Sequence, residues 1–207
     1  MMCGRYVVTY PVTKTQKLVK KAINTDNIEN YNAHPYQSLP IIKKYINGNT
    51  LEKLKWGINP AWAQKNNYKP IINARLETIN EKVTFKKLIK FFRCVVIADG
   101  YYEWKRVQNY KLPYYLFRKD KKNIYFAGIF QKNEFCIITQ KACHKVENIH
   151  ERQPVILNEK DINKYLNLEN SGFEVLNNSI KSELDFYQIS SDVNKPTNNN
   201  QRLIQPV

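Results

Sequence analysis

A cysteine close to the N-terminus is the residue of this sequence best suited to covalent chemistry. The chain begins Met1-Met2-Cys3-Gly4, so removal of both methionines leaves a thiol two carbon atoms from a free α-amine. An α-amine has a pKa of about 7.7 to 8.0, against about 10.4 for lysine, and is partly nucleophilic at neutral pH. Such an aminothiol captures aldehydes as an imine and then as a thiazolidine ring. The alternative is that Cys3 is a small buried apolar residue.

Three further segments place polar groups among apolar neighbours. Asn73 offers an amide that can hold an amine, and Arg75 a guanidinium that can hold a phosphate. Glu103 lies among aromatic residues, where desolvation raises a carboxyl pKa toward the range useful for proton transfer. His150 can transfer protons near neutral pH, and Arg152 can point to the same strand face. Each residue also has a structural interpretation, as a turn amide, a lysine-paired carboxylate or a core histidine.

The composition indicates one basic domain. A chain of 207 residues fits a single domain with a sizeable core. Lys and Arg total 33 against 18 Asp and Glu, a net charge of +15, which favours a polyanionic partner, nucleic acid first. The alternative is that the lysines only solvate the surface. No run approaches the roughly 18 apolar residues of a membrane span, and no signal peptide is evident, so we expect a soluble, intracellular protein that contacts no membrane.

The four cysteines indicate neither a disulfide framework nor a zinc site. Cys3, Cys94, Cys136 and Cys143 show no CxxC spacing. We interpret the last three as core residues. Cys143-His144 is a weak candidate metal pair, because no second pair matches it. We therefore expect no metal and no cofactor.

The elements that must position these residues are short. Apolar spacing predicts helices over 15–23, 80–92, 158–166 and 174–184. Runs rich in β-branched and aromatic residues predict strands over 39–45, 51–57, 94–98, 113–117, 124–130 and 134–139, with a hairpin turn at 47–49. We expect residues 26–40 to form an ordered loop leading into the first of these strands, and residues 193–207 to lie extended over the body. The pattern predicts one α+β domain built on antiparallel sheet.

The order and the residues of these segments resemble those of the SRAP domain family. This family is named for an association with the SOS response and is known for suicidal capture of abasic DNA. The resemblance spans most of the chain. It rests on Cys3-Gly4-Arg5-Tyr6, Lys55-Trp56-Gly57-Ile58-Asn59-Pro60-Ala61-Trp62-Ala63, Asn73-Ala74-Arg75-Leu76-Glu77, Arg93-Cys94, Gly100-Tyr101-Tyr102-Glu103-Trp104, Phe126-Ala127-Gly128-Ile129, Ile137-Ile138-Thr139 and Ile149-His150-Glu151-Arg152-Gln153-Pro154-Val155. It implies one SRAP-like α+β domain over residues 3–207, with antiparallel sheets in a barrel-like core and a few short packed helices.

The resemblance implies a mechanism and the residues that carry it. Cys3 attacks the ring-opened aldehyde of an abasic site in single-stranded DNA, and the resulting thiazolidine crosslink shields the lesion during DNA repair. Asn73 positions the amine, Glu103 is the acid and base beside it, and His150 assists opening of the sugar ring. Arg5, Arg75 and Arg152 are then expected to hold phosphates, while Trp62 and Trp104 offer stacking surface to bases.

The same resemblance implies the setting in which the protein works. The expected partner is single-stranded DNA containing abasic sites. We expect a monomer in the cytoplasm and nucleoid, or in the nucleus of a eukaryotic host. Peptidase-like removal of the initiator methionine and an AP-lyase activity are also implied.

Three positions depart from the family pattern. The family begins Met-Cys, whereas this chain begins Met1-Met2-Cys3; Gln153 stands where methionine is common, and Asn59 lies in a segment that is usually more apolar. Two alternatives therefore stay open beside abasic-site capture. One is an autoproteolytic cysteine peptidase with Cys3 as its nucleophile. The other is a non-catalytic single-stranded DNA-binding module that relies on charge and tryptophans.

Overall fold

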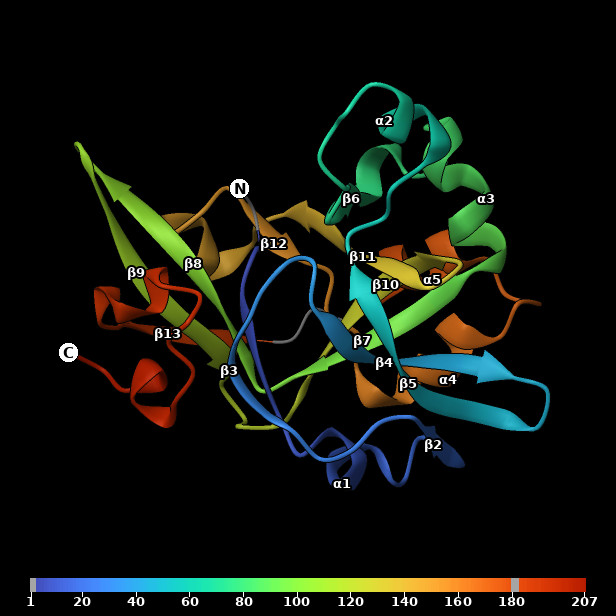
Figure 1. Ribbon diagram of the computed structural model, residues 1–207, viewed down its shortest axis with the longest axis horizontal. Helices are drawn as coiled ribbons and strands as arrows, with labels where there is room; N and C mark the ends of the chain where they lie inside the picture. Colours follow the sequence, from blue (N-terminus) through green and yellow to red (C-terminus); the bar gives the residue numbers. More distant parts are fainter. Residues whose placement is uncertain (1–2, 180–182) are drawn as a thin grey trace.

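The computed structural model describes residues 3–179 and 183–207. Within them two sheets pack together, one of five strands in the order β13-β9-β8-β1-β3 and one of eight strands, with β12-β11-β10-β7-β4-β5-β2 as its path and β6 paired to β11 (Figure 1). The strands are β1 Tyr6–Thr9, β2 Lys21–Ile23, β3 Glu29–Ala33, β4 Ser38–Tyr45, β5 Gly48–Trp56, β6 Asn73–Arg75, β7 Arg93–Ala98, β8 Gly100–Val107, β9 Tyr110–Arg118, β10 Ile124–Gln131, β11 Glu134–Lys141, β12 Arg152–Pro154 and β13 Leu184–Gln188.

The larger sheet closes on itself through β11. This strand pairs antiparallel with β10 and, in the other direction, parallel with the end of β5, where Phe135 lies opposite Trp56. The rings of these two residues stack, with centroids 6.2 Å apart. Because β5 also continues through β4 and β7 back to β10, the strands form a ring. A closed ring leaves few open strand edges and fixes the strands relative to one another. The predicted barrel-like α+β core is confirmed.

The core lies inside this ring and against the smaller sheet. All six residues of β7 are buried, as expected for a continuous apolar strand with both faces covered. Phe126 joins the two sheets, because its ring meets Tyr6 of β1 and Tyr101 of β8 edge-on, each at 5.9 Å between centroids. The larger sheet therefore packs directly against the strands that carry Tyr6 and Tyr101.

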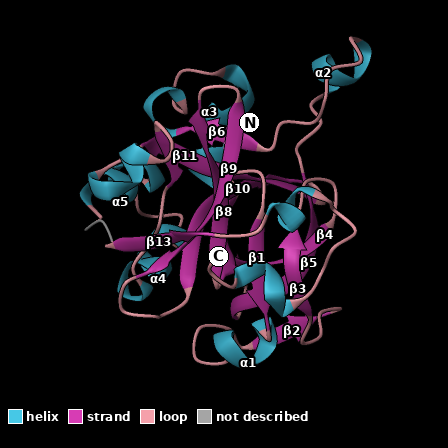
Figure 2. Ribbon diagram, turned by 90° about the vertical axis from the view of Figure 1, so that its left-hand side faces the viewer, coloured by secondary structure: helices cyan, strands magenta, loops and turns pink. Residues whose placement is uncertain are grey.

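The helices are short and surround the sheets. They are α1 Pro11–Thr15, α2 Ala61–Lys65, α3 Val83–Phe91, α4 Glu159–Leu166 and α5 Gly172–Asn178, with 3-10 turns at Leu76–Thr78, His144–Asn148, Ser191–Asn194 and Gln201–Ile204. Figure 2 shows α4 and α5 together on one side of the molecule. The buried guanidinium of Arg93 on β7 anchors them, because it donates to the carbonyl oxygens of Asn167 and Asn170 at 2.9 and 3.0 Å.

Several predicted elements are confirmed with small shifts. The strands at 39–45, 51–57, 94–98, 113–117, 124–130 and 134–139 correspond to β4, β5, β7, β9, β10 and β11, and the helices at 80–92 and 158–166 to α3 and α4. The hairpin turn is also present, since Tyr45 pairs with Gly48 across two residues.

Four predictions fail locally. The helix expected over 15–23 is wrong: α1 starts earlier, at Pro11, and ends at Thr15, while Lys21–Ile23 is β2, a strand recruited by parallel pairing with β5. The loop over 26–40 contains β3. The helix over 174–184 ends as α5 at Asn178; residues 180–182 lie outside the described residues, and Leu184 begins β13. The terminal segment 193–207 includes the 3-10 turn Gln201–Ile204 and is not fully extended.

In residues 3–179 and 183–207, no helix has the length and apolar character needed to cross a bilayer.

We expect Phe126→Ala to lower the free energy of unfolding by about 3 to 5 kcal/mol, because it leaves a cavity at the junction of the two sheets. Val83→Ala is the control: Val83 is 94% exposed, so its truncation should change stability by less than about 0.5 kcal/mol. Urea unfolding followed by tryptophan fluorescence measures both. Equal losses would contradict the described core.

Candidate functional site

A cavity of about 820 Å³ opens beside β8, just before the chain enters β1. β1 pairs with β8 at Val7–Gly100 and Tyr6–Tyr101. The last backbone hydrogen bond between the two segments runs from the amide of Tyr102 to the carbonyl of Arg5, and beyond it the segments separate. Residues from four parts of the chain line the opening: Gly4, Arg5, Glu103, Trp104, Arg106, Lys111, Ile149, His150, Glu151 and Asn194. The cavity therefore brings together Arg5, Glu103, Trp104 and His150, four of the nine residues that the sequence singled out.

Cys3 is fully buried and is not among the residues that line this cavity, although its neighbour Gly4 and its partner Glu103 are. Its backbone nitrogen donates a hydrogen bond to Oε1 of Glu103 at 2.6 Å. The backbone of Cys3 is left-handed, with φ of 36°, a conformation that is uncommon for a non-glycine residue. Burial, and then the neighbouring Glu103, raise the pKa of the Cys3 thiol well above its usual value. The thiol is therefore protonated in this arrangement, and the nitrogen of Cys3 faces the carboxyl group.

Glu103 is a buried carboxyl group with few partners. Its side chain is 1% exposed, and desolvation raises its pKa to about 7 despite the hydrogen bond from Cys3. The raised pKa that the sequence predicted for Glu103 is thus present. At neutral pH this carboxyl is divided between its two protonation states, which suits a group that both donates and accepts protons.

His150 also lines this cavity. Its Nδ1 accepts a hydrogen bond from the backbone N–H of Arg152 at 3.1 Å, so the neutral ring carries its proton on Nε2. Desolvation lowers the pKa of His150 from its usual value. The imidazole is consequently neutral at neutral pH, with Nε2–H as a donor.

Asn73, Arg75 and Arg152 lie along β11, on the two strands that flank it. β6 pairs parallel to β11, with Arg75 opposite Thr139, and β12 pairs antiparallel on the other side, with Arg152 opposite Lys141. Asn73 is half-buried and Arg75 is exposed. These residues do not line the cavity that contains Glu103 and His150.

Arg152 is already paired with a carboxylate. Its two terminal nitrogens donate to Oε1 and Oε2 of Glu77 at 3.1 and 2.8 Å, and one of them also donates to the carbonyl of Thr139 at 3.0 Å. Arg152, which was predicted to hold a phosphate, thus joins β12 to the segment after β6. This pairing also orients the backbone N–H that fixes His150.

Arg5 builds the wall of the cavity. One nitrogen of Arg5 donates to Oδ1 of Asn32 and to the carbonyl of Val193, both at 2.7 Å. The indole N–H of Trp104 donates to Oδ1 of Asn194 at 2.8 Å. Together Arg5 and Trp104 hold the C-terminal segment against β1 and β8, so that Asn194 lines the cavity.

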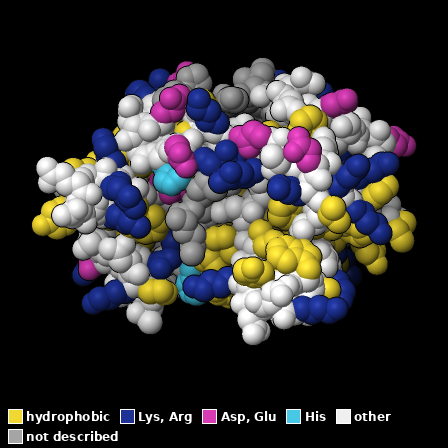
Figure 3. All heavy atoms as spheres, turned by 90° about the horizontal axis from the view of Figure 1, so that it is seen from above, with side chains coloured by type: hydrophobic (Ala, Val, Ile, Leu, Met, Phe, Trp, Pro, Cys, Tyr) yellow, Lys and Arg dark blue, Asp and Glu magenta, His cyan; other side chains and the backbone are white. Residues whose placement is uncertain are grey.

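Trp62 lies in a different hollow. It is on α2, 48% exposed, and its indole N–H donates to Oγ1 of Thr84 at 3.2 Å. With Pro60, Val83, Phe92 and Phe130 it lines an apolar hollow of about 660 Å³. In Figure 3 hydrophobic side chains gather in a broad patch on this face, with lysines and arginines around it. The structure does not bring Trp62 into the cavity with Glu103.

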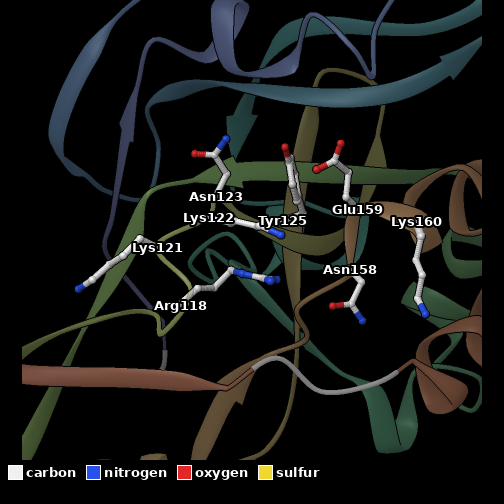
Figure 4. Close-up of a pocket in the computed structure, with 8 residues that line it drawn as sticks. All are labelled: Arg118, Lys121, Lys122, Asn123, Tyr125, Asn158, Glu159 and Lys160. Carbon is white, nitrogen blue, oxygen red and sulfur yellow. The ribbon is translucent and has the colours of Figure 1, made fainter.

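A basic hollow of about 450 Å³ lies at the other end of β9 (Figure 4). Two of its four cations interact with the protein's own groups: Arg118 is paired with Asp120 at 2.6 Å, and Lys121 lies 3.7 Å from the centre of the Phe117 ring. No charged group at this hollow belongs to the set that the sequence predicted.

The structure adds three residues to the cavity that the sequence analysis missed: Arg106, Lys111 and Asn194. Arg106 lies two residues after Trp104 on β8. A prediction of a strand over 100–107 would therefore have placed both side chains on one face of it. Asn194 carries no local signal, because only the fold brings it there.

The remaining cysteines differ in burial. Cys94 and Cys136 are buried, as predicted, but Cys143 is only half-buried, and the core interpretation of this residue is wrong. Its amide donates to Oε1 of Gln153 at 3.1 Å. Among the residues that the structure describes, no three His, Cys, Asp or Glu side chains cluster closely enough to hold a metal ion.

Comparisons with known proteins agree in pointing to one family. The family model described as SOS response associated peptidase (SRAP) matches residues 2–196. Abasic site processing protein YoqW of Bacillus subtilis is 36% identical, over 99% of both chains, and abasic site processing protein YedK of Escherichia coli is 28% identical over the full length of both. A crystal structure of a protein from Bacteroides thetaiotaomicron shares the fold, with a TM-score of 0.83 at 24% identity over 99% of this chain and 100% of that one.

The raised pKa of Glu103 makes stability depend on pH. The folded protein holds this proton up to about pH 7, whereas an unfolded chain releases it near about pH 4.3. The contribution to stability is therefore complete below about pH 4 and is lost as the pH rises to 7. We expect the difference in unfolding free energy between wild type and Glu103→Gln to change by about 3 kcal/mol over this window.

Urea unfolding at several pH values measures this difference, and intact mass spectrometry identifies the N-terminus of each protein. A difference that is constant from pH 4 to 7.5 would contradict the burial of an ionisable carboxyl at position 103.

Proposed function

The chain belongs to the SOS response associated peptidase (SRAP) family, and we propose that it processes abasic sites in single-stranded DNA by attaching itself covalently to them through Cys3. One observation carries the proposal: the nitrogen of Cys3, which becomes the α-amine once the methionines are removed, lies 2.6 Å from the buried carboxyl of Glu103. Two relatives, at 36% and 28% identity, are named abasic site processing proteins.

The first chemical step is formation of an imine. An abasic site in its open form carries an aldehyde. The unprotonated α-amine of Cys3 adds to the aldehyde carbon, and the resulting hydroxyl group leaves as water after it takes a proton from Glu103. Glu103 is suited to this step because its pKa of about 7 lets the same group accept the ammonium proton first and return it later.

The second step closes the ring. The sulfur of Cys3 adds to the carbon of the protonated imine, a C–S bond forms as the C=N double bond becomes single, and the thiol proton passes to the Glu103 carboxylate left by the first step. The product is a thiazolidine that joins the chain to C1′ of the sugar. No oxidant or reductant is needed, and water is the only group released over the two steps.

The other site residues assist these steps. His150 donates a hydrogen bond from Nε2–H to the ring oxygen of the closed sugar, which favours opening to the aldehyde as the proton of the C1′ hydroxyl passes through solvent to that oxygen; a neutral imidazole with a fixed Nδ1 acceptor suits this role. Asn73 orients the amine, and Arg75, which is exposed beside β11, holds a flanking phosphate. Trp104 offers a stacking surface at the cavity.

A specific observation also favours an autoprocessing peptidase. Glu103 accepts a hydrogen bond from the nitrogen of the Met2–Cys3 peptide bond. A carboxyl group at this place can protonate the leaving nitrogen when water attacks the carbonyl carbon of Met2. Removal of the methionines and capture of the aldehyde then use one acid and base in sequence, so the two activities are compatible.

We expect Cys3→Ala to abolish the crosslink while leaving noncovalent binding within about threefold of wild type, because cationic side chains supply most of the affinity for DNA. A denaturing gel with a labelled oligonucleotide that contains one abasic site measures the crosslink. Fluorescence anisotropy with an aldehyde-free abasic analogue measures binding. Cys136→Ala removes a buried thiol of β11 and is the matched control.

The proposal fails if wild-type protein that begins at Cys3 leaves the abasic oligonucleotide uncrosslinked. Noncovalent binding by that same protein would then favour the non-catalytic single-stranded DNA-binding module.

We expect Glu103→Gln to retain its N-terminal methionines, because an amide cannot donate the proton that the leaving nitrogen requires. Intact mass spectrometry of freshly expressed wild type and variant measures the outcome. Glu151→Gln is the control, since Glu151 lines the same cavity but is exposed. If the Glu103 variant loses its methionines as completely as wild type, Glu103 has no part in processing.

A further inference from the structure

The hairpin formed by β8 and β9 extends beyond the sheet that contains it. Past Tyr102, in the described part of the chain, β8 pairs with β9 alone, down to the last pair, Val107 with Tyr110. Figure 1 shows this hairpin as an arm that projects from the body on the side of the N-terminus. We call the part from Glu103 to Leu112 the hairpin arm.

Two cations face each other on this arm. Arg106 of β8 lies directly opposite Lys111 of β9, and directly opposed residues of antiparallel strands point to the same face. Like charges in such a pair repel, so the pair weakens the arm rather than supporting it. Both side chains are exposed, and within residues 3–179 and 183–207 neither makes a hydrogen bond or an ion pair.

The pair belongs to the cavity of the candidate site. Arg106 and Lys111 line the same 820 Å³ opening as Glu103 and His150. The carboxyl groups at that opening are Glu103, which is buried against Cys3, and Glu151, which is exposed. Among the described residues neither forms a salt bridge with the two cations. Trp104 shares the face of the arm with Arg106, because the two are alternate residues of one strand.

We propose that Arg106 and Lys111 hold the phosphate backbone of the bound DNA strand on one side of the abasic site. The proposal rests on the proposed function for the identity of its ligand. A polyanion relieves the repulsion between the two cations, and a guanidinium opposite an ammonium can contact one phosphate, or two successive phosphates, from both strands of the arm. Trp104 then meets the base nearest the lesion.

The length of the arm sets the position of this contact. Arg106 is three positions along β8 from Glu103, and a strand rises by about 3.4 Å per residue, which places Arg106 about 10 Å from the acid. Stacked nucleotides of one strand repeat about every 3.4 Å. The pair therefore reaches the second or third phosphate from the lesion, and it does so on one flank only, because the arm stands on one side of the cavity.

The basic hollow at the far end of β9 provides a matched comparison. Lys111 and Arg118 lie about 23 Å apart along the strand. Lys122 and Lys160 line that hollow, so replacing both removes the same charge from a distant surface. This control separates a local phosphate contact from the general attraction of a basic protein for DNA.

The test measures noncovalent binding by Arg106→Gln/Lys111→Gln and by Lys122→Gln/Lys160→Gln. The probe is a fluorescent oligonucleotide with a central tetrahydrofuran abasic analogue, which carries no aldehyde, at 50 to 300 mM salt. Each lost phosphate contact on a single strand reduces the slope of log K against log salt by about 0.7, or about fivefold in affinity at 0.1 M salt. We expect the arm variant to lose about 1.4 in slope and about 25-fold in affinity, and the control less than twofold.

A second series shortens the oligonucleotide from either end. We expect the affinity of wild type to fall by about 25-fold when one flank of the oligonucleotide is cut below about three nucleotides, and to stay unchanged when the other flank is cut to the same length. The arm variant should show no such asymmetry.

Three results would overturn the proposal. An unchanged slope in the arm variant means that the cations only protect the free strand edge from aggregation. Equal losses in the arm variant and the control mean that charge acts without a local contact. Symmetric truncation profiles in wild type exclude a one-sided contact. The probe carries no aldehyde, so this test does not depend on the proposed chemistry. If wild type fails to crosslink true abasic DNA, only the proposed chemistry is wrong. A loss of binding affinity confined to the arm variant would still support the phosphate contact.

Discussion

The hydrogen bond from the nitrogen of Cys3 to Glu103 is the contact on which the rest of the site depends. It forms because β1 and β8 are in a fixed antiparallel register, with Tyr6 opposite Tyr101, so the residues just before β1 come to lie beside the middle of β8. Phe126 of the larger sheet stabilises this register, because its ring contacts both tyrosines. A carboxyl group with 1% exposure is costly to bury, and the raised pKa of Glu103 is the direct consequence of that cost.

The closed ring of the larger sheet fixes the remaining groups around this contact. β11 is paired on both sides, with β6 carrying Asn73 and Arg75 and with β12 carrying Arg152. The ion pair between Arg152 and Glu77 ties these flanking segments together, and the amide of Arg152 fixes the imidazole of His150. A change in the strand order of the ring would therefore move His150 relative to Glu103. The sheet acts as a rigid mount for a site whose polar groups come from loops and strand ends.

Local patterns in the sequence predicted what is locally determined. The apolar run of β7 and the burial of Glu103 just after it follow from neighbouring residue types. The helix expected over 15–23 failed because pairing with β5 outweighed the apolar spacing. Arg5 was expected to hold phosphate, yet its guanidinium holds the chain 188 residues away at Val193, which no local pattern encodes. The opposed cations of the hairpin arm were missed for a related reason, because only the strand register reveals that they face each other.

The burial of the Cys3 sulfur determines the order of the proposed steps. A thiol whose pKa is raised by burial and by a neighbouring carboxyl is a poor nucleophile, so the amine, which lies against an acid and base of pKa about 7, must react first. The imine that forms is protonated and places a positive charge next to the sulfur. An adjacent positive charge favours the thiolate, and the thiol therefore ionises only after its electrophile is in place. In the proposed sequence of steps, burial thus keeps Cys3 unreactive toward other electrophiles until its own nitrogen has captured an aldehyde.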